Sequence, residues 1–420
     1  MLIRRIRGTS DLYQNDILLF EYILSTVKEV AKRCIFNQLS TPILEYSEVF
    51  HRTLGDTSDI INKETYSFLD RDKKYLTLRP EFTASVVRAA IENGLLQNLP
   101  LKLFSYGPLF RHERPQKCRL RQFHQFNFEH IGSKGSNADL ELLLMAQSIL
   151  DTFTLSNVKL HINSLGSRED SARYREALVC YLEKYKNDLS AISQERLSKN
   201  VLRILDSKDI EDKKIIKGAP LITNFLGISA KKSLDHITEQ LHNLNMEFII
   251  SPRLVRGIDY YSNTVFEFVS NDLGSQGTVI AGGRYDYLIK QMGGPEIPAS
   301  GFAGGFERIS TLLAMKKLKI ESRETLCLIP IGNIAEDYAV RLAHKLRTKH
   351  LLCTELHFGL TLKKRMQKAN KLGCEYVLIF GEDEMKCGKL LVKNMKTGTE
   401  RLVQEVELVA YLNISESMEK

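Results

Sequence analysis

The chain has 420 residues, 43% of them hydrophobic and 26% charged, which is the composition of a soluble globular protein with two or three domains. A net charge of +8 permits a polyanionic partner without requiring one. No apolar run approaches the roughly 20 residues of a membrane-spanning helix, and no signal peptide is recognised, so we expect a cytoplasmic protein without a membrane partner. The seven cysteines never form a C-x-x-C pair, which argues for reduced thiols and against a zinc ribbon or a disulfide framework.

The first 167 residues carry helical and extended patterns in turn. Apolar residues at helical spacing predict helices, and period-two alternation bounded by turn residues predicts strands. In chain order we expect a helix capped at Ser10 or Asp11, an extended segment around Pro42, a hairpin that turns at residues 70–73, a helix, two strands, a helix and a strand. The corresponding residues are 11–36, 39–50, 65–81, 82–94, 101–111, 120–132, 138–150 and 158–166.

The pattern changes after residue 167. Residues 168–246 are rich in lysine, glutamate, aspartate and leucine and poor in glycine, which predicts a helical insertion. Strand-like, glycine-rich segments then return, and from residue 325 strands and helices alternate, which predicts a small α/β domain with a final hairpin and helix. We therefore expect a core in two parts, residues 1–167 and 247–322, interrupted by the insertion and followed by an α/β domain at residues 325–420.

Residues 110–130, FRHERPQKCRLRQFHQFNFEH, are too polar for a core strand and too aromatic for a surface loop. Alternate side chains of a strand share a face, so one face should show cations, an aromatic ring, amides and an acid in a row. These residues are Arg119, Arg121, Phe123, Gln125, Asn127 and Glu129. The part from Phe123 to Glu129 spans roughly 20 Å, which suits an anionic group, a flat ring and a small polar molecule in a line. The alternative, an exposed strand with solvated charges, fits poorly with Phe123 on that face.

These residues carry a resemblance to the class II aminoacyl-tRNA synthetases in their histidyl form. Residues 110–132 resemble the second signature motif of that family, and four further segments resemble its other signatures in the same order. They are LTLRPEFTASVVRA, LVRGIDYY, AGGRYDYL and GFAGGFER. RGTSDLYQND and TPILEYSEVF resemble the N-terminal and first-motif segments. The resemblance covers essentially the whole chain. It implies an α+β fold with an antiparallel sheet flanked by helices, a helical insertion and a C-terminal α/β anticodon-binding domain.

The resemblance implies a two-step reaction. The carboxylate of L-histidine attacks the α-phosphate of ATP, and the resulting histidyl-adenylate passes its acyl group to tRNA. By resemblance, Arg111 contacts the α-phosphate and the carboxylate, Arg256 is the second catalytic cation, and Arg308 reaches the ATP phosphates. Arginine suits these positions because its planar fork meets two oxygens at once and stays charged.

The resemblance also implies the binding residues for ATP. Phe123 should stack on the adenine, Glu113 should lie near the edge of that ring, and Arg119 should reach the phosphates. Arg121 is the weaker candidate for the phosphates, because it can instead pair with an acid. We expect Mg²⁺ to arrive with ATP, and the sequence gives no metal site built from protein ligands.

The substrate histidine is expected at the far end of the same strand. Glu81, Thr83 and Gln125 resemble the pocket for its α-amino group, and a carboxylate suits an ammonium. Glu129 and Tyr261 should hold the two nitrogens of the imidazole, because one acceptor and one donor at a fixed separation select a ring with one of each. Two aromatic residues either wall this pocket or belong to the core: Tyr260 and Tyr285.

Some residues in these segments have simpler explanations or depart from the family pattern. His112, His124 and His130 are read as structural histidines rather than metal ligands. The last two share a strand face, but no cysteine or acid completes a shell on that face. Four residues differ from those usual in the family, which affects the shape of the pocket rather than its charged groups: Phe82, Asn127, Phe128 and Gly304.

The expected activity is therefore that of a histidine–tRNA ligase acting as a homodimer, with the interface near Pro42. The main alternative is a non-catalytic paralogue that senses histidine and regulates histidine biosynthesis, and another is an RNA-binding protein with a decayed catalytic domain. The retained arginines and the α/β domain favour the ligase. The lysine-rich helix of that domain either faces tRNA phosphates or is a solvated surface. Its cations are Lys363, Lys364, Arg365, Lys368 and Lys371.

Overall fold

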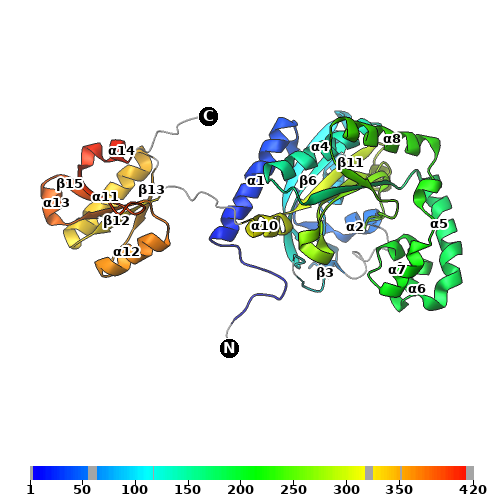
Figure 1. Cartoon of the computed structure of the whole chain (residues 1–420), viewed down its shortest axis with the longest axis horizontal. Helices are drawn as coiled ribbons and strands as arrows, with labels where there is room; N and C mark the ends of the chain where they lie inside the picture. Colours follow the sequence, from blue (N-terminus) through cyan, green and yellow to red (C-terminus); the bar gives the residue numbers. More distant parts are fainter. Residues whose placement is uncertain (1–2, 55–63, 117, 317–324, 351, 413–420) are drawn as a thin grey trace. The chain divides into compact units, whose positions relative to one another are not determined.

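A computed structural model of the chain describes residues 3–54, 64–116, 118–316, 325–350 and 352–412 (Figure 1). It divides into two compact units, Met1–Leu318 and Lys319–Lys420. The first unit contains an eight-stranded sheet and a three-stranded sheet, and the second contains a five-stranded sheet. Within the described residues, no helix is both long and apolar enough to cross a membrane.

The eight-stranded sheet is antiparallel apart from its two edge pairs, as predicted. Its strand order is β1-β5-β6-β11-β10-β9-β7-β8. The bounds are β1 Asn37–Gln38, β5 Leu101–Phe110, β6 Gln122–Ile131, β7 Val158–Ser164, β8 Phe248–Ile250, β9 Ser262–Ser270, β10 Thr278–Arg284 and β11 Ala299–Gly305. Strands from the two predicted halves of the core therefore pair in one sheet, with β6 next to β11.

Helices pack against one face of this sheet, where the largest hydrophobic cluster lies. They are α1 Asn15–Arg33, α4 Ser136–Thr152, α8 Ile228–Asn243 and α10 Phe306–Met315. Phe128 of β6 stacks on Phe302 of β11 at 4.9 Å between ring centroids. Gly304 allows Phe126 to fit, because a Cβ at residue 304 would lie 2.2 Å from that ring. The family departure at Gly304 thus accommodates the phenylalanine opposite it.

A second cluster lies on the other face of the sheet, around α3 Thr83–Glu92 and the short helix α9 Leu288–Gln291. The three-stranded sheet packs nearby with order β2-β4-β3, its bounds being β2 Leu44–Tyr46, β3 Tyr66–Leu69 and β4 Tyr75–Leu78. The β3–β4 hairpin turns where predicted, and the Asp70 side chain accepts a hydrogen bond from the backbone N–H of Lys74 at 2.8 Å.

Two expectations for the N-terminal part are wrong. The extended segment around Pro42 ends at Tyr46, because residues Ser47–Leu54 form the helix α2, whose Phe50 is fully buried. The first helix begins at Asn15 rather than after Ser10 or Asp11. Gln14 has a positive φ of 51°, which breaks the helix there.

The helical segment after residue 167 forms its own small core. It contains α5 Arg168–Leu182, α6 Ala191–Lys199 and α7 Ile210–Lys217, which pack around the fully buried Tyr174. Ser167 caps α5 through a capping box with Asp170. Its last helix, α8, packs instead against α4 and adds its apolar face to the cluster of the large sheet.

The second unit is a mixed sheet with helices, in agreement with the predicted α/β domain. The strand order is β13-β12-β14-β15-β16, and the first three strands are parallel. The bounds are β12 Thr325–Pro330, α11 Asn333–Lys349, β13 Cys353–Leu356, α12 Leu362–Lys371, β14 Tyr376–Phe380, α13 Glu382–Lys386, β15 Lys389–Asn394, β16 Glu400–Gln404 and α14 Leu408–Tyr411. Arg365 of α12 is buried and donates to the carbonyls of Pro330 and His357, so it does not belong to the exposed cations of this helix.

Candidate active site

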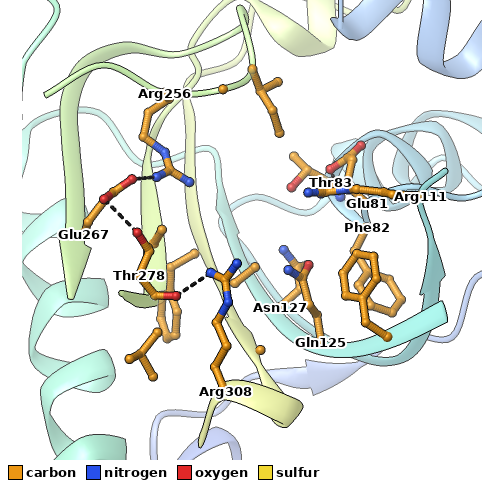
Figure 2. Close-up of a pocket in the computed structure, with 18 of the residues that line it drawn as sticks. Glu81, Phe82, Thr83, Arg111, Gln125, Asn127, Arg256, Glu267, Thr278 and Arg308 are labelled. Atoms are coloured by element: carbon orange, nitrogen blue, oxygen red, sulfur yellow. Dashed lines mark hydrogen bonds and ion pairs between the residues drawn. The ribbon is translucent and has the colours of Figure 1, made fainter. Parts of the chain in front are cut away.

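A pocket lies over β6, β10 and β11 of the large sheet, next to the start of α10 (Figure 2). The loop after β5, the start of α3 and the segment before β9 complete its wall. All of the site residues predicted from the sequence line this pocket except Glu129 and the two alternative candidates, Arg121 and Tyr285. Those that line it are Glu81, Thr83, Arg111, Glu113, Arg119, Phe123, Gln125, Arg256, Tyr260, Tyr261 and Arg308. The fold thus gathers residues that are more than 200 positions apart in the sequence.

Strand β6 turns alternate side chains to the pocket and to the core. Phe123, Gln125 and Asn127 line the pocket, whereas Phe126 and Phe128 are buried in the large cluster on the opposite face. This arrangement follows from the period of two along a strand. The row of a ring and two amides that the sequence predicts therefore exists on one face.

The row does not extend back to Arg119 as a continuous strand, so that part of the expectation is wrong. The strand begins at Gln122, and Arg119 forms an isolated bridge with Gln116 in the preceding loop. The backbone N–H of Arg121 donates to the Gly8 carbonyl at 2.7 Å. Arg119 is ion-paired with Glu113, its partner across the loop.

Three arginines bring positive charge to the pocket, Arg111 from one side and Arg256 and Arg308 from the other (Figure 2). Arg111 follows β5, and its Nε donates to the Pro80 carbonyl at 2.9 Å. Its guanidinium carbon lies 5.2 Å from the centroid of the Phe123 ring. Burial lowers the pKa of Arg111 and of Arg308, and Arg111 adds to the lowering at Arg308. Buried cations that repel one another in this way favour the binding of an anion, because the anion offsets their repulsion.

An acid and a backbone carbonyl hold the other two arginines. Glu267 pairs with Arg256 and accepts a hydrogen bond from the Thr278 hydroxyl at 3.0 Å, and Arg308 donates to the Thr278 carbonyl (Figure 2). Burial opposes the charge on Arg256, but Glu267 and nearby tyrosines raise the pKa of Arg256, so it stays a cation. The sequence interpretation missed Glu267 and Thr278. Glu267 could have been recognised from the sequence, because it is a charged residue between apolar residues of a predicted strand.

Acids and tyrosines form the side of the pocket next to Arg111. Glu81 is buried at the start of α3, where its carboxylate accepts hydrogen bonds from the backbone N–H groups of Thr83 and Ala84 at 2.7 Å each. Burial raises the pKa of Glu81 and outweighs these hydrogen bonds. Tyr260 and Tyr261 pack together at 4.8 Å between ring centroids and form the adjoining wall. This side can receive hydrogen-bond donors from a ligand.

Glu129 lies beneath the lining of the pocket and is fully buried. Its carboxylate accepts a hydrogen bond from Asn127 Nδ2 at 2.9 Å and another from the Tyr285 hydroxyl. Gly301 makes room for it, because a Cβ there would lie 1.8 Å from Glu129 Oε2. Burial raises the pKa of Glu129 to about 8, against the opposing effect of hydrogen bonds from Thr83, Tyr285 and Asn127. Tyr285 supports the site from below and does not line it.

The helical insertion contacts the segment that carries Arg256. Asn200 Nδ2 donates to both carboxylate oxygens of Asp259 at 2.9 Å. Gly257 permits the close approach of Arg203, since a Cβ at residue 257 would lie 3.0 Å from Arg203 Nη1. The insertion therefore contacts the segment of Arg256 directly, and no local pattern in the sequence predicted this contact.

The three histidines near β6 have ordinary protein contacts. His124 Nδ1 lies 3.0 Å from a carboxylate oxygen of Glu307, and His130 Nε2 lies 2.8 Å from the Ser133 hydroxyl. The ring of His112 packs edge-on against that of Tyr66. Across the described part of the chain, no three histidine, cysteine or acidic residues come close enough to hold a metal ion.

A mainly antiparallel sheet with arginines from motif-like segments over one face defines a class II aminoacyl-tRNA synthetase. Comparison with known families agrees with this class. The family model for histidyl-tRNA synthetase matches residues 8–309, and the model for an anticodon binding domain matches residues 325–413. The chain belongs to the histidyl-tRNA synthetase family.

Individual relatives support this family over the full length. A histidine–tRNA ligase of Wolbachia pipientis subsp. Culex pipiens (strain wPip) is 49% identical over 96% of this chain and 98% of its own. The crystal structure of apo S. aureus histidyl-tRNA synthetase superposes with a TM-score of 0.81 and 31% identity, over 98% of this chain and 99% of that chain. An ATP phosphoribosyltransferase regulatory subunit/histidyl-tRNA synthetase from Bacillus halodurans shares the fold, with a TM-score of 0.66 and 22% identity over 91% of this chain and 99% of that chain.

Proposed function

We propose that this chain is a histidine–tRNA ligase, which joins L-histidine to its cognate tRNA through a histidyl-adenylate formed from ATP. The observation that carries the proposal is the convergence of three arginines, an aromatic ring and buried acids in one pocket of the histidyl-type core. Arginines suit the negative charge that gathers at phosphorus, and the acids suit an amino-acid ammonium and a ring N–H.

Catalysis of adenylate formation is assigned to Arg111 and Arg256. The histidine carboxylate attacks the α-phosphorus, a new P–O bond forms, and the bond to pyrophosphate breaks. Arg111 next to Phe123 and Arg256 held by Glu267 supply fixed cations for this step. Arg308, at the start of α10, is assigned to the phosphates of ATP. ATP brings Mg²⁺ bound to its phosphate oxygens, which adds further positive charge there.

The adenine is assigned to Phe123, whose ring lies in the pocket wall. Glu113 and Arg119 pair with each other in the loop above it. In the proposed complex, Arg119 turns toward the phosphates and Glu113 stays at the edge of the adenine. The pair thus keeps the cation of the loop in place before ATP arrives.

The amino acid is assigned to the acidic side of the pocket. The α-amino group meets Glu81, Thr83 and Gln125, and the imidazole lies between Glu129 and Tyr261. Tyr260 forms the wall beside Tyr261 and Tyr285. A ligand without both imidazole nitrogens would leave buried polar groups unpaired, and such mismatches give strong discrimination.

The second unit is proposed to bind the anticodon of tRNA. Four lysines of α12 are exposed and can contact phosphates: Lys363, Lys364, Lys368 and Lys371.

All seven cysteines are free thiols, and two of them, Cys327 and Cys374, are buried in the second unit. Free thiols support the proposed location in the cytoplasm.

A homodimer is proposed through the three-stranded sheet. Several large apolar side chains near Pro42 and on this sheet are exposed: Ile43, Leu44, Tyr46, Phe68, Leu69 and Tyr75. Apolar patches of this kind typically mark protein interfaces. A dimer should appear in analytical ultracentrifugation, and Tyr46→Asp should convert it to monomer. A monomeric wild-type chain at micromolar concentration would contradict this assembly.

Histidine-dependent exchange of pyrophosphate into ATP tests the ligase directly. We expect exchange with L-histidine, and its loss by at least about 100-fold in Arg256→Ala, because a transition-state cation is removed. Protein that binds histidine but shows no exchange would instead be the regulatory paralogue. Exchange without charging of tRNA would leave only the first step and contradict the assignment of the second unit.

A further inference from the structure

Among the described residues that line the pocket, two have a buried polar side-chain atom without a hydrogen-bond partner: Arg256 at Nε and Asn127 at Oδ1. Asn127 lies on β6 between Gln125 and Glu129, lines the pocket, and is only 2% exposed. Its Nδ2 donates to Glu129 Oε1 at 2.9 Å, and its Oδ1 is buried without a hydrogen-bond partner among the described residues. Figure 2 shows its amide at the centre of the pocket beside Gln125. A buried carbonyl oxygen without a donor is unfavourable, so a donor from a ligand is the expected partner.

The surroundings of Glu129 explain why a ligand that enters the pocket meets Asn127 before it meets Glu129. Both oxygens of the carboxylate already have donors, one from Asn127 and one from Tyr285. Oxygen Oε2 also lies against the backbone of β11, where only a glycine fits at residue 301. A ligand that approaches Glu129 from the pocket therefore reaches the amide of Asn127 before it reaches most of the carboxylate.

We propose that Asn127 is a further specificity-determining residue for L-histidine. Its Oδ1 accepts a hydrogen bond from the imidazole N–H that faces Glu129, while its Nδ2 holds the carboxylate of Glu129 in place. The N–H is shared between the two acceptors in a three-centre bond. The inference rests on the proposed function and names a residue of the histidine site that the family resemblance did not supply.

The first test compares ligand affinities in three proteins by isothermal titration calorimetry. Asn127→Leu keeps the volume of the side chain and removes both polar ends. We expect L-histidine to bind Asn127→Leu at least about 10-fold more weakly than wild type, with ATP affinity unchanged within about two-fold. Ser300→Ala is the matched control, because the Ser300 hydroxyl is also buried without a described partner but does not line the pocket. Its histidine affinity should equal that of wild type.

A second test separates direct contact from an effect through Glu129. The two ring-N-methyl histidines are each titrated into wild type and into Asn127→Leu. In wild type, methylation of the donating nitrogen removes the hydrogen bond and lowers affinity. In Asn127→Leu, that penalty should shrink by about 10-fold for one of the two analogues, because the contact is already lost. The leucine leaves no new space for the methyl group, so steric relief does not produce the same result.

Unchanged histidine affinity in Asn127→Leu, or an unchanged methylation penalty for both analogues, would overturn the proposal. Retained ATP binding shows that the variant is folded. If it does not bind ATP, Asn127→Gly replaces it, and the same loss of histidine affinity is expected. Wild-type protein that binds no histidine would contradict the proposed function itself, which is a separate outcome from failure of the Asn127 contact.

Discussion

Glu129→Gln should remove a strong pH dependence from histidine binding. Burial raises the pKa of Glu129 to about 8 in the empty pocket. Its described neighbours Asn127 and Tyr285 both donate to it, so the imidazole N–H should also need the ionised acceptor. At pH 7 only about one carboxyl in eleven is ionised, and the apparent affinity falls by the same factor. The cost is about 1.4 kcal/mol at pH 7 and about 2.7 kcal/mol at pH 6.

The direction of this pH dependence follows from which form of Glu129 binds histidine. The ligand selects the form that lacks the proton, so affinity rises as the pH rises and levels off above about 8. The dissociation constant of wild type should fall nearly tenfold between pH 6 and pH 7. Titration calorimetry in buffers of different ionisation enthalpy should show release of about one proton per histidine bound at pH 7. Histidine titrates as well, so Glu129→Gln provides the baseline, and only the difference belongs to Glu129.

Equal pH slopes in wild type and Glu129→Gln would refute this reasoning. It would mean either that Glu129 is ionised before histidine binds or that the protonated acid serves as a donor. Equal proton release in the two proteins would lead to the same conclusion. A Glu129→Gln variant that binds histidine as tightly as wild type at pH 8.5 would further remove Glu129 from the imidazole site.

Three other predictions follow from contacts around the pocket and on the second unit. Glu267→Gln should lower the rate of pyrophosphate exchange by about 10-fold or more while changing histidine affinity less than about threefold, because it loosens Arg256 in the transition state; equal losses in both would contradict a positioning role. Asn200→Ala and Asp259→Ala should each slow exchange, and the double variant should be no slower than the worse single one, since both remove the same contact; additive losses would exclude it. Lys364→Glu should raise the KM for tRNA severalfold and leave exchange unchanged; an unchanged KM would remove this lysine from the tRNA surface.

Local patterns in the sequence correctly predicted features that are determined by neighbouring residues of the chain. The alternation along β6 correctly separated Phe123 and Gln125, which line the pocket, from Phe126 in the core. The hairpin at residues 66–78 was also correct, because its turn is built by Asp70 and its neighbours. In both cases the information lies within a few residues of the chain.

Features set by distant contacts were not predictable from the sequence in the same way. In the sequence, Arg365 looked like one exposed cation among several. In the structure it is buried and donates hydrogen bonds to the carbonyls of Pro330 and His357. The contact of Asn200 with Asp259 joins two segments whose separation hides the pairing. The unpartnered oxygen of Asn127 likewise becomes visible only when β6, β11 and Tyr285 surround Glu129.

A crystal structure with a non-hydrolysable analogue of histidyl-adenylate tests the assignment of the pocket most directly. The adenine should stack on Phe123, the phosphate mimic should lie between Arg111 and Arg256, and the imidazole should face Asn127, Glu129 and Tyr261. An imidazole bound away from these residues, or a phosphate mimic that contacts neither arginine, would contradict the assignment.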